Sequence, residues 1–87
     1  MYDLEIDKKA LKELKKIPDS DQEKITKRIN ALKENPRPVG YEPLHGTLSD
    51  YYRIRFGNYQ IVYEIFDKKL IVFIFKIEGR GSVYKKK

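Results

Sequence analysis

Two arginines placed two residues apart, Arg53 and Arg55, are the first candidates for chemistry in this sequence of 87 residues. They lie in the stretch YYRIRF, which alternates aromatic or aliphatic residues with arginines. This alternation predicts a strand with both guanidinium groups on one face. Guanidinium groups carry planar N–H donors that match the oxygens of a phosphate. The spacing therefore indicates a phosphate-binding face, and an ordinary solvated strand face is the alternative.

The dipeptide Gly57-Asn58 separates the arginines from a second alternating stretch, YQIVYEI. A two-residue turn of type II′ at this point predicts a hairpin in which Gln60 lies opposite Arg55. Gln60 and Glu64 then share the face of the arginines. The other face of the hairpin is apolar enough to pack against helices and consists of Ile54, Phe56, Tyr59, Ile61 and Tyr63.

The C-terminal sequence EGRGSVYKKK holds a second candidate set. Glycines on both sides of Arg80 allow the backbone to curl, so that this arginine can reach the face of the sheet. The alternative is a frayed basic end. The candidate residues of this segment are Arg80, Tyr84, Lys85, Lys86 and Lys87.

The composition limits the classes of function. A net charge of +6 and a pI near 9.5 favour an acidic partner, which could be nucleic acid, an acidic protein or an anionic membrane surface. The chain has no cysteine and a single histidine, His45, which argues against disulfides, thiol catalysis and a structural zinc site. His45 lies in a proline-rich stretch, and we interpret it as structural or exposed.

No apolar run approaches the roughly 20 residues that cross a bilayer, and the N-terminus MYDLEIDKK has no signal-peptide pattern. We therefore expect a soluble protein of the cytoplasm. Charged residues make up 37% of the chain, and this bias towards lysine and glutamate is shared by proteins of hyperthermophiles, so the source could be thermophilic.

The elements that position the candidate residues can be read from periodicity and turn signals. Residues 2–6 alternate and predict a short strand. Asp7 is the expected N-cap of a first helix that Pro18 ends, and Ser20 or Asp21 is the expected N-cap of a second, with Glu23 completing a capping box. Residues 35–46 predict an irregular connection, and three strands are expected at 50–56, 59–66 and 70–77.

The sum is one α+β domain over residues 1–87. We expect a helical hairpin packed on one face of a twisted, mainly antiparallel four-stranded sheet. The last strand, LIVFIF, is apolar on both faces and is therefore expected inside the sheet.

The whole chain resembles the RelE/ParE superfamily of bacterial and archaeal toxins. The resemblance rests on the order of the segments DKKALKELKKIP, INALKENP, LHGTLSDYYRIRFGNYQIVYEI and VFIFKIEGRGSVYKKK, of which the third is the most specific. Within the superfamily, the arginine pair and the C-terminal tyrosine resemble the RelE branch, whose members cut mRNA in the ribosomal A site. ParE relatives instead poison DNA gyrase and generally lack this set.

The resemblance implies roles for individual residues. Arg53 and Arg55 match the basic pair of the first long strand, Arg80 matches the arginine after the last strand, and Tyr84 matches a C-terminal tyrosine implicated in catalysis. Gln60 departs from the family, which usually has an arginine there, but its amide can still bind RNA. The three terminal lysines are further candidates for RNA binding: Lys85, Lys86 and Lys87.

The implied reaction needs no metal and no cofactor. A ribose 2′-hydroxyl attacks the adjacent phosphorus in line, a base takes its proton, and an acid protonates the leaving 5′-oxygen. Cations stabilise the charge that develops on the phosphorane, and this is the role expected of the arginines. Tyr84 is the candidate for proton transfer.

The resemblance also implies partners, namely a cognate RelB-like antitoxin and the ribosomal A site with its rRNA and mRNA, without a membrane. Three functions stay open at this point. The chain could be a ribosome-dependent mRNA endonuclease, a ParE-like gyrase poison that would not need Tyr84, or an RNA-binding member with weakened catalysis. Gln60 favours the last of these, as does Gly79, which sits where many relatives carry histidine or lysine.

Overall fold

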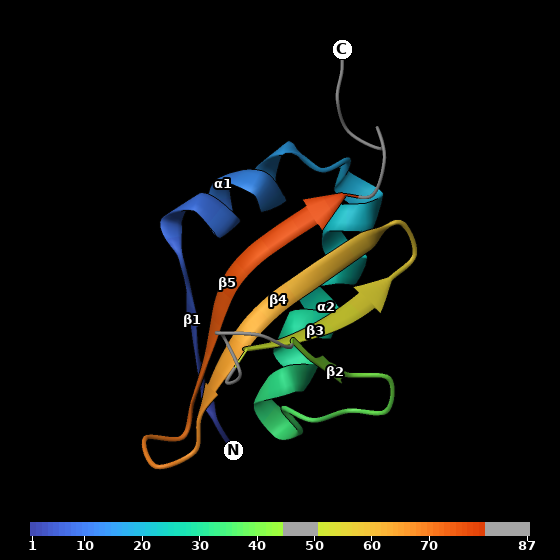
Figure 1. Cartoon of the computed structure of the whole chain (residues 1–87). Helices are drawn as coiled ribbons and strands as arrows, with labels where there is room; N and C mark the ends of the chain where they lie inside the picture. The colour runs from blue at the N-terminus through green and yellow to red at the C-terminus, as the bar shows by residue number, and fades with distance from the viewer. Residues whose placement is uncertain (45–50, 80–87) are drawn as a thin grey trace.

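The computed structural model describes residues 1–44 and 51–79, in which two helices cover one face of a five-stranded sheet (Figure 1). The strands lie in the order β1-β5-β4-β3-β2, with β1 parallel to β5 and the other neighbouring pairs antiparallel. The predicted α+β class is confirmed, as is the internal position of the last strand. In chain order the elements are β1 (Asp3–Ile6), α1 (Lys8–Lys16), α2 (Asp19–Glu34), β2 (Glu42–Pro43), β3 (Tyr51–Phe56), β4 (Tyr59–Phe66) and β5 (Ile71–Gly79).

The predicted number of four strands is wrong, because the connection after α2 contains β2. This strand has only two residues, Glu42 opposite Arg53 and Pro43 opposite Tyr52. Two residues are too few to give an alternating pattern, so the strand exists only through its pairing with β3. A proline is compatible with this position because β2 is an edge strand, where a missing N–H leaves no partner unsatisfied.

The hairpin of β3 and β4 has the predicted register. Phe56 lies opposite Tyr59, and Arg55 lies opposite Gln60. Gly57 has a φ of 59°, whereas Asn58 does not have a positive φ, which is the combination expected of a type II′ turn. The turn therefore fixes which face of the sheet each side chain of the hairpin joins.

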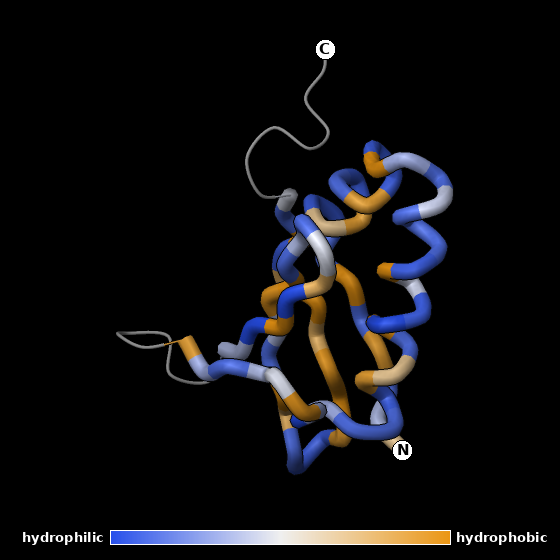
Figure 2. Tube along the Cα trace, turned by 90° about the vertical axis from the view of Figure 1, so that its right-hand side faces the viewer, coloured by the Kyte–Doolittle hydropathy of each residue, from blue (hydrophilic) through white to orange (hydrophobic). Residues whose placement is uncertain are grey.

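The core lies between the helices and the face of the sheet that they cover, and Figure 2 shows the hydrophobic strands facing the helices. Both predicted helical stripes are buried, and Tyr59, Ile61 and Tyr63 meet them from β4. Leu11 is an exception because it is exposed on the outer side of α1. The buried helical residues are Ala10, Leu14 and Ile17 from the first stripe and Ile25, Ile29 and Leu32 from the second.

A β-bulge in β5 changes the alternation of that strand. Val62 pairs with Lys76, but the next residue, Tyr63, pairs with Ile74, so Phe75 is an extra residue. Because of this insertion, Ile74 and Ile77 both face the core although they are three residues apart. The bulge therefore turns Lys76 and Glu78 towards the uncovered face.

The start of the first helix is as predicted and the start of the second is not. The Asp7 carboxylate accepts a hydrogen bond of 3.0 Å from the backbone N–H of Lys9. The second helix begins at Asp19 after Pro18, so neither Ser20 nor Asp21 is the N-cap. The early start places Gln22 where its side chain donates to the last carbonyls of the preceding turn, at Leu14 and Ile17.

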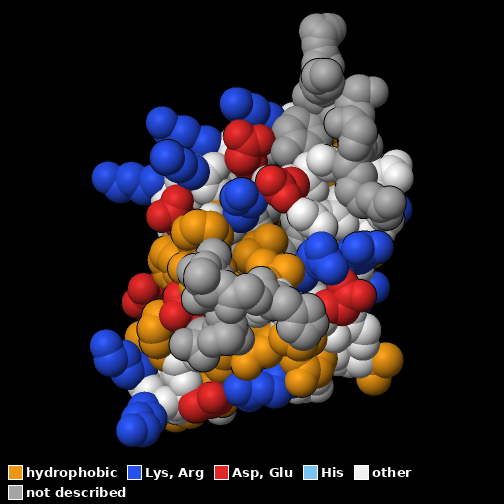
Figure 3. All heavy atoms as spheres, in the orientation of Figure 1, with side chains coloured by type: hydrophobic (Ala, Val, Ile, Leu, Met, Phe, Trp, Pro, Cys, Tyr) orange, Lys and Arg blue, Asp and Glu red, His pale blue; other side chains and the backbone are white. Residues whose placement is uncertain are grey.

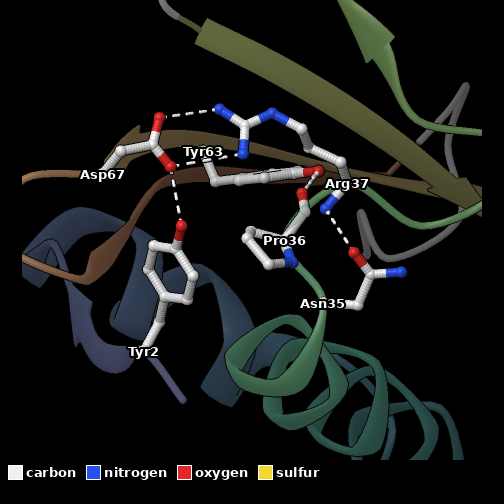
Figure 4. A network of polar contacts seen from close by, with 6 residues as sticks. All are labelled: Tyr2, Asn35, Pro36, Arg37, Tyr63 and Asp67. Carbon is white, nitrogen blue, oxygen red and sulfur yellow. Dashed lines mark hydrogen bonds and ion pairs between the residues drawn. The ribbon is translucent and has the colours of Figure 1, made fainter.

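A polar network fastens the connection after α2 to the sheet (Figure 4). The Tyr63 hydroxyl donates a buried hydrogen bond of 2.7 Å to the Pro36 carbonyl. Arg37 binds Asp67 at 2.8 Å, and the Tyr2 hydroxyl donates to the same carboxylate at 2.6 Å. This network holds the segment that leads into β2.

The pKa values of three side chains in this network are shifted. The hydrogen bond from Arg37 lowers the pKa of the Asp67 carboxyl, and the hydrogen bond to Asp67 raises the pKa of the Tyr2 phenol. Burial raises the pKa of Tyr63. Each shift favours the protonation state that the network needs near neutral pH, namely an ionised Asp67 and two neutral phenols.

Candidate functional site

The uncovered face of the sheet brings polar side chains of four strands into two rows. The first row runs across β2, β3, β4 and β5 through Glu42, Arg53, Val62 and Lys76. The second row, nearer the Gly57 turn, runs across β3, β4 and β5 through Arg55, Gln60 and Glu78. Neighbouring strands are about 4.8 Å apart, so side chains in one row are within reach of each other.

Arg53 and Arg55 lie on this face, as predicted, and Ile54 between them is 6% exposed and part of the core. The face is not simply basic, however. Glu42 Oε1 lies 2.7 Å from Arg53 Nη2, accepts a hydrogen bond of 3.0 Å from Arg53 Nε, and lies 3.9 Å from Arg55 Nε. One carboxylate therefore serves both arginines, and the Arg53 side chain is 27% exposed against 51% for Arg55.

Gln60 also has a carboxylate partner. Its amide donates a hydrogen bond of 2.6 Å to Glu78 Oε1, and Glu78 Oε2 lies 3.5 Å from Lys76 Nζ. Gln60 therefore lies on the face that the helices leave uncovered, as predicted, although its contact with Glu78 leaves it half-buried. Figure 3 shows the outcome on the surface, with acidic side chains interleaved among the lysines and arginines of this face.

Three residues of this cluster were missed by sequence reasoning: Glu42, Lys76 and Glu78. A partial signal existed for Glu78, because KIEG alternates and extends β5 to Gly79, beyond the predicted end at residue 77. An unbroken register would nevertheless pair Gln60 with Ile77, so the face that Lys76 and Glu78 join follows only from the bulge at Phe75. Glu42 had no signal, since its strand has no pattern of its own.

The part of the face next to the arginine rows is apolar. The rings of Tyr51 and Phe75 meet edge to face with centroids 5.0 Å apart. Val62 is 6% exposed although it is not part of the core cluster. The arginines are thus bordered by the partly exposed rings of Tyr51 and Phe75, and aromatic rings suit the stacking of unpaired bases beside a phosphate contact.

A groove of about 690 Å³ adjoins the second row. It lies between α1 and the last residues of β5, where β1 no longer pairs with β5. Its walls carry both signs of charge, with Lys9 and Glu13 from α1 and Lys76 and Glu78 from β5. The groove therefore lies between the uncovered face and the first helix.

Several predicted residues lie outside the described parts of the chain. These are Arg80, Tyr84, Lys85, Lys86, Lys87 and His45. The described chain ends at Gly79, which lies opposite Tyr59 beside the Gly57 turn. The end of β5 is thus at the row of Arg55 and Gln60.

Within residues 1–44 and 51–79, no group of three histidine, aspartate or glutamate side chains is placed to hold a metal ion. Neither of the helices described is long and apolar enough to cross a membrane. Among the described residues, the face offers guanidinium, ammonium and amide donors to an anion.

The fold is that of a toxin family. The family described as "ParE toxin of type II toxin-antitoxin system, parDE" matches residues 4–84. The chain belongs to this family.

Individual relatives place it close to RelE toxins. It is 34% identical to the "Putative toxin RelE1" of Methanocaldococcus jannaschii, covering 97% of this chain and 96% of that protein. It is 33% identical to the "mRNA interferase toxin RelE" of Escherichia coli, covering 95% and 90%. The RelE–RelB complex of Pyrococcus horikoshii contains a chain of the same fold, with a TM-score of 0.80, 28% identity and coverage of 93% and 97%.

Proposed function

We propose that this protein is a ribosome-dependent endoribonuclease that cleaves mRNA in the ribosomal A site and thereby inhibits translation. The observation that carries the proposal is the pair Arg53 and Arg55, which project from one strand onto an uncovered face bordered by aromatic surface. The similarity to an mRNA interferase of the RelE type supports it. Since ribosomes, mRNA and a RelB-like antitoxin are in the cytoplasm, the protein acts there.

The proposed reaction is an internal transfer at phosphorus. The ribose 2′-oxygen forms a bond to the adjacent phosphorus, and the bond from phosphorus to the 5′-oxygen breaks, which leaves a 2′,3′-cyclic phosphate and a 5′-hydroxyl. Arg53, Arg55 and Arg80 stabilise the additional negative charge of the phosphorane. Tyr84 transfers a proton at one of the two oxygens, and no metal or cofactor takes part.

Tyr84 provides the first test. Replacing Tyr84 by Phe removes the proton and the hydroxyl but keeps the ring, so single-turnover cleavage of mRNA on programmed ribosomes should fall by about 10²–10⁴. Binding to the ribosome should stay within about a factor of two, because the ring and the charges are unchanged. Equal cleavage by the wild type and Tyr84→Phe would remove Tyr84 from the mechanism.

A second candidate function is that of a gyrase poison, which the description of the matching family favours. A supercoiling assay with purified DNA gyrase, run beside primer extension on ribosome-bound mRNA, separates the two. Inhibition of supercoiling together with intact mRNA would replace the nuclease by the gyrase poison. Cleavage of mRNA with unimpaired gyrase supports the proposal.

The proposed partner is a RelB-like antitoxin, in line with the RelE–RelB complex of similar fold. Because the chain has a net charge of +6 and this side of the molecule presents exposed cations such as Arg55, an acidic, amphipathic segment suits it. A structure of the complex tests this. An antitoxin that touches only the outer sides of the two helices would contradict it.

A further inference from the structure

The Glu42 carboxylate occupies the position at which the two arginines of the site converge. A single oxygen, Oε1, lies 2.7 Å from Arg53 Nη2 and 3.0 Å from Arg53 Nε, and 3.9 Å from Arg55 Nε. Two donors on one edge of the Arg53 guanidinium therefore meet the same acceptor. That edge is the one that would bind a phosphate oxygen, since arginine recognises carboxylates and phosphates with the same fork of donors.

The register of the sheet, and not a chance side-chain rotamer, brings Glu42 to this position. Glu42 is the direct cross-strand partner of Arg53, and Arg55 is two residues further along the same face of β3. The network of Arg37, Asp67 and Tyr63 fastens the segment that leads into β2. The carboxylate is thus presented to both arginines by the backbone.

The contact is nevertheless easy to displace. The Glu42 side chain is 48% exposed, and its strand consists of two residues at the edge of the sheet. Exposed ion pairs of this kind change an equilibrium by about a factor of one to five, because water solvates the separated charges well. A phosphate that brings its own negative charge can therefore replace the carboxylate.

We propose that Glu42 is a built-in competitor of RNA at the Arg53–Arg55 pair: its carboxylate fills the anion-binding position in the free protein, and a backbone phosphate must displace it. The identification of the displacing ligand as RNA rests on the proposed function. The observation that an anionic side chain occupies the position is independent of the proposed function. Glu42 is accordingly a residue that sets the affinity of the site for phosphate, and it does not touch the reacting atoms.

The test compares two substitutions that each remove one negative charge from the same face. Glu42→Gln keeps the shape of the side chain and removes its charge. Glu5→Gln is the matched control, because Glu5 is exposed on the uncovered face of β1, at the opposite edge of the sheet from β2. Four strand spacings, about 19 Å, separate the two edges, which is beyond the Debye length of about 10 Å at 0.1 M salt.

The probe is inorganic phosphate, titrated into the full chain at constant ionic strength. NMR signals of the Arg53 and Arg55 Nε–H groups report binding at the site itself. We expect the dissociation constant of Glu42→Gln to be about two to five times lower than that of the wild type, and that of Glu5→Gln to be unchanged. An unchanged or higher dissociation constant for Glu42→Gln overturns the proposal. The proposal is also overturned if phosphate shifts the Nε–H signal of neither arginine in any of the three proteins.

Cleavage of mRNA on programmed ribosomes is measured with the same three proteins. The expected result is a kcat/KM that rises about two- to fivefold for Glu42→Gln, with kcat unchanged. A lower kcat for this variant would assign Glu42 to the positioning of the arginines instead and overturn competition. If no protein cleaves while phosphate still binds more tightly to Glu42→Gln, the nuclease function fails and the role of Glu42 as a competitor stands.

Discussion

Gln60 is the position at which the resemblance implies an arginine in other members of the family, and its surroundings explain how a neutral side chain fits there. Its amide donates to Glu78 Oε1 at 2.6 Å, and Arg55 is its direct partner across the hairpin. The second row of the uncovered face therefore consists of one cation, Arg55, one neutral donor, Gln60, and one carboxylate, Glu78. An arginine introduced at this position would find Glu78 as a ready partner.

This arrangement gives a prediction for Gln60→Arg in single-turnover cleavage on programmed ribosomes. A charge-assisted contact made in the transition state is typically worth about 10²–10³ in rate, so an added cation should accelerate cleavage. Glu78 would hold the new guanidinium in the single variant, and the double variant Gln60→Arg/Glu78→Gln should therefore be the faster of the two. Glu78→Gln alone is the control, and an unchanged rate in both Arg variants would show that the position lies away from the scissile phosphate.

At the scale of elements, the hairpin of β3 and β4 decides which of its side chains lie on the uncovered face. Its turn depends on Gly57, which has a φ of 59° that side chains with a Cβ rarely adopt. No atom lies within 4 Å of a Cβ built at this position, so the cost of a substitution comes from the backbone conformation and not from a clash.

Gly57→Ala should therefore lower the free energy of unfolding by about 1–2 kcal/mol, because an alanine in the left-handed region costs about that much. Asn58→Ala, at the exposed neighbouring position without a positive φ, should stay within about 0.5 kcal/mol of the wild type. Urea unfolding followed by circular dichroism measures both. Equal stability of the two variants would mean that the turn relaxes to another type.

The connection that carries Glu42 depends on a second element contact, the hydrogen bond from Tyr63 to the Pro36 carbonyl. Tyr63→Phe should lower the free energy of unfolding by about 1–3 kcal/mol, since it leaves a buried carbonyl without its donor. Tyr2→Phe removes a hydroxyl that donates to Asp67 in exposed surroundings, and its effect should be much smaller because water replaces the lost bond. Thermal or urea unfolding of Tyr63→Phe and Tyr2→Phe provides the measurement. If the two variants lose similar free energies of unfolding, burial of the Tyr63 hydrogen bond is not the reason for its contribution.

At the scale of the molecule, the net charge of +6 is distributed unevenly. Helix α1 alone carries five lysines and one glutamate, whereas the uncovered face alternates cations with carboxylates. The cations that could attract an anionic partner are therefore spread over much of the surface, while Arg53 and Arg55 lie within a nearly balanced cluster.

Replacing both Arg53 and Arg55 by Ala should weaken binding to a 2′-O-methylated single-stranded RNA. It should also reduce the slope of log K against log salt by about 1.4, because each phosphate contact to a single strand contributes about 0.7. Lys68→Ala/Lys69→Ala is the matched control, since it removes two exposed charges from the turn between β4 and β5, at the other end of the sheet. If both double variants change the slope equally, the arginines act only through net charge.

The sequence by itself determined the α+β class, the apolar faces of the helices and the register of the hairpin. These follow from local signals: an apolar stripe with helical spacing, an alternation of two, and a glycine turn that fixes which residues lie opposite each other. The placement of Arg53 and Arg55 on one face, with Ile54 in the core, follows from the same signals.

Only the tertiary structure decided which groups surround the arginines. Glu42 is 11 residues away from Arg53 along the chain, and Glu78 is 18 residues away from Gln60. Their contacts depend on a two-residue strand and on the bulge at Phe75, neither of which leaves a periodic pattern in the sequence. Cross-strand neighbours are set by hydrogen bonding between distant segments, so the charge balance of the face could be known only once the strands were paired.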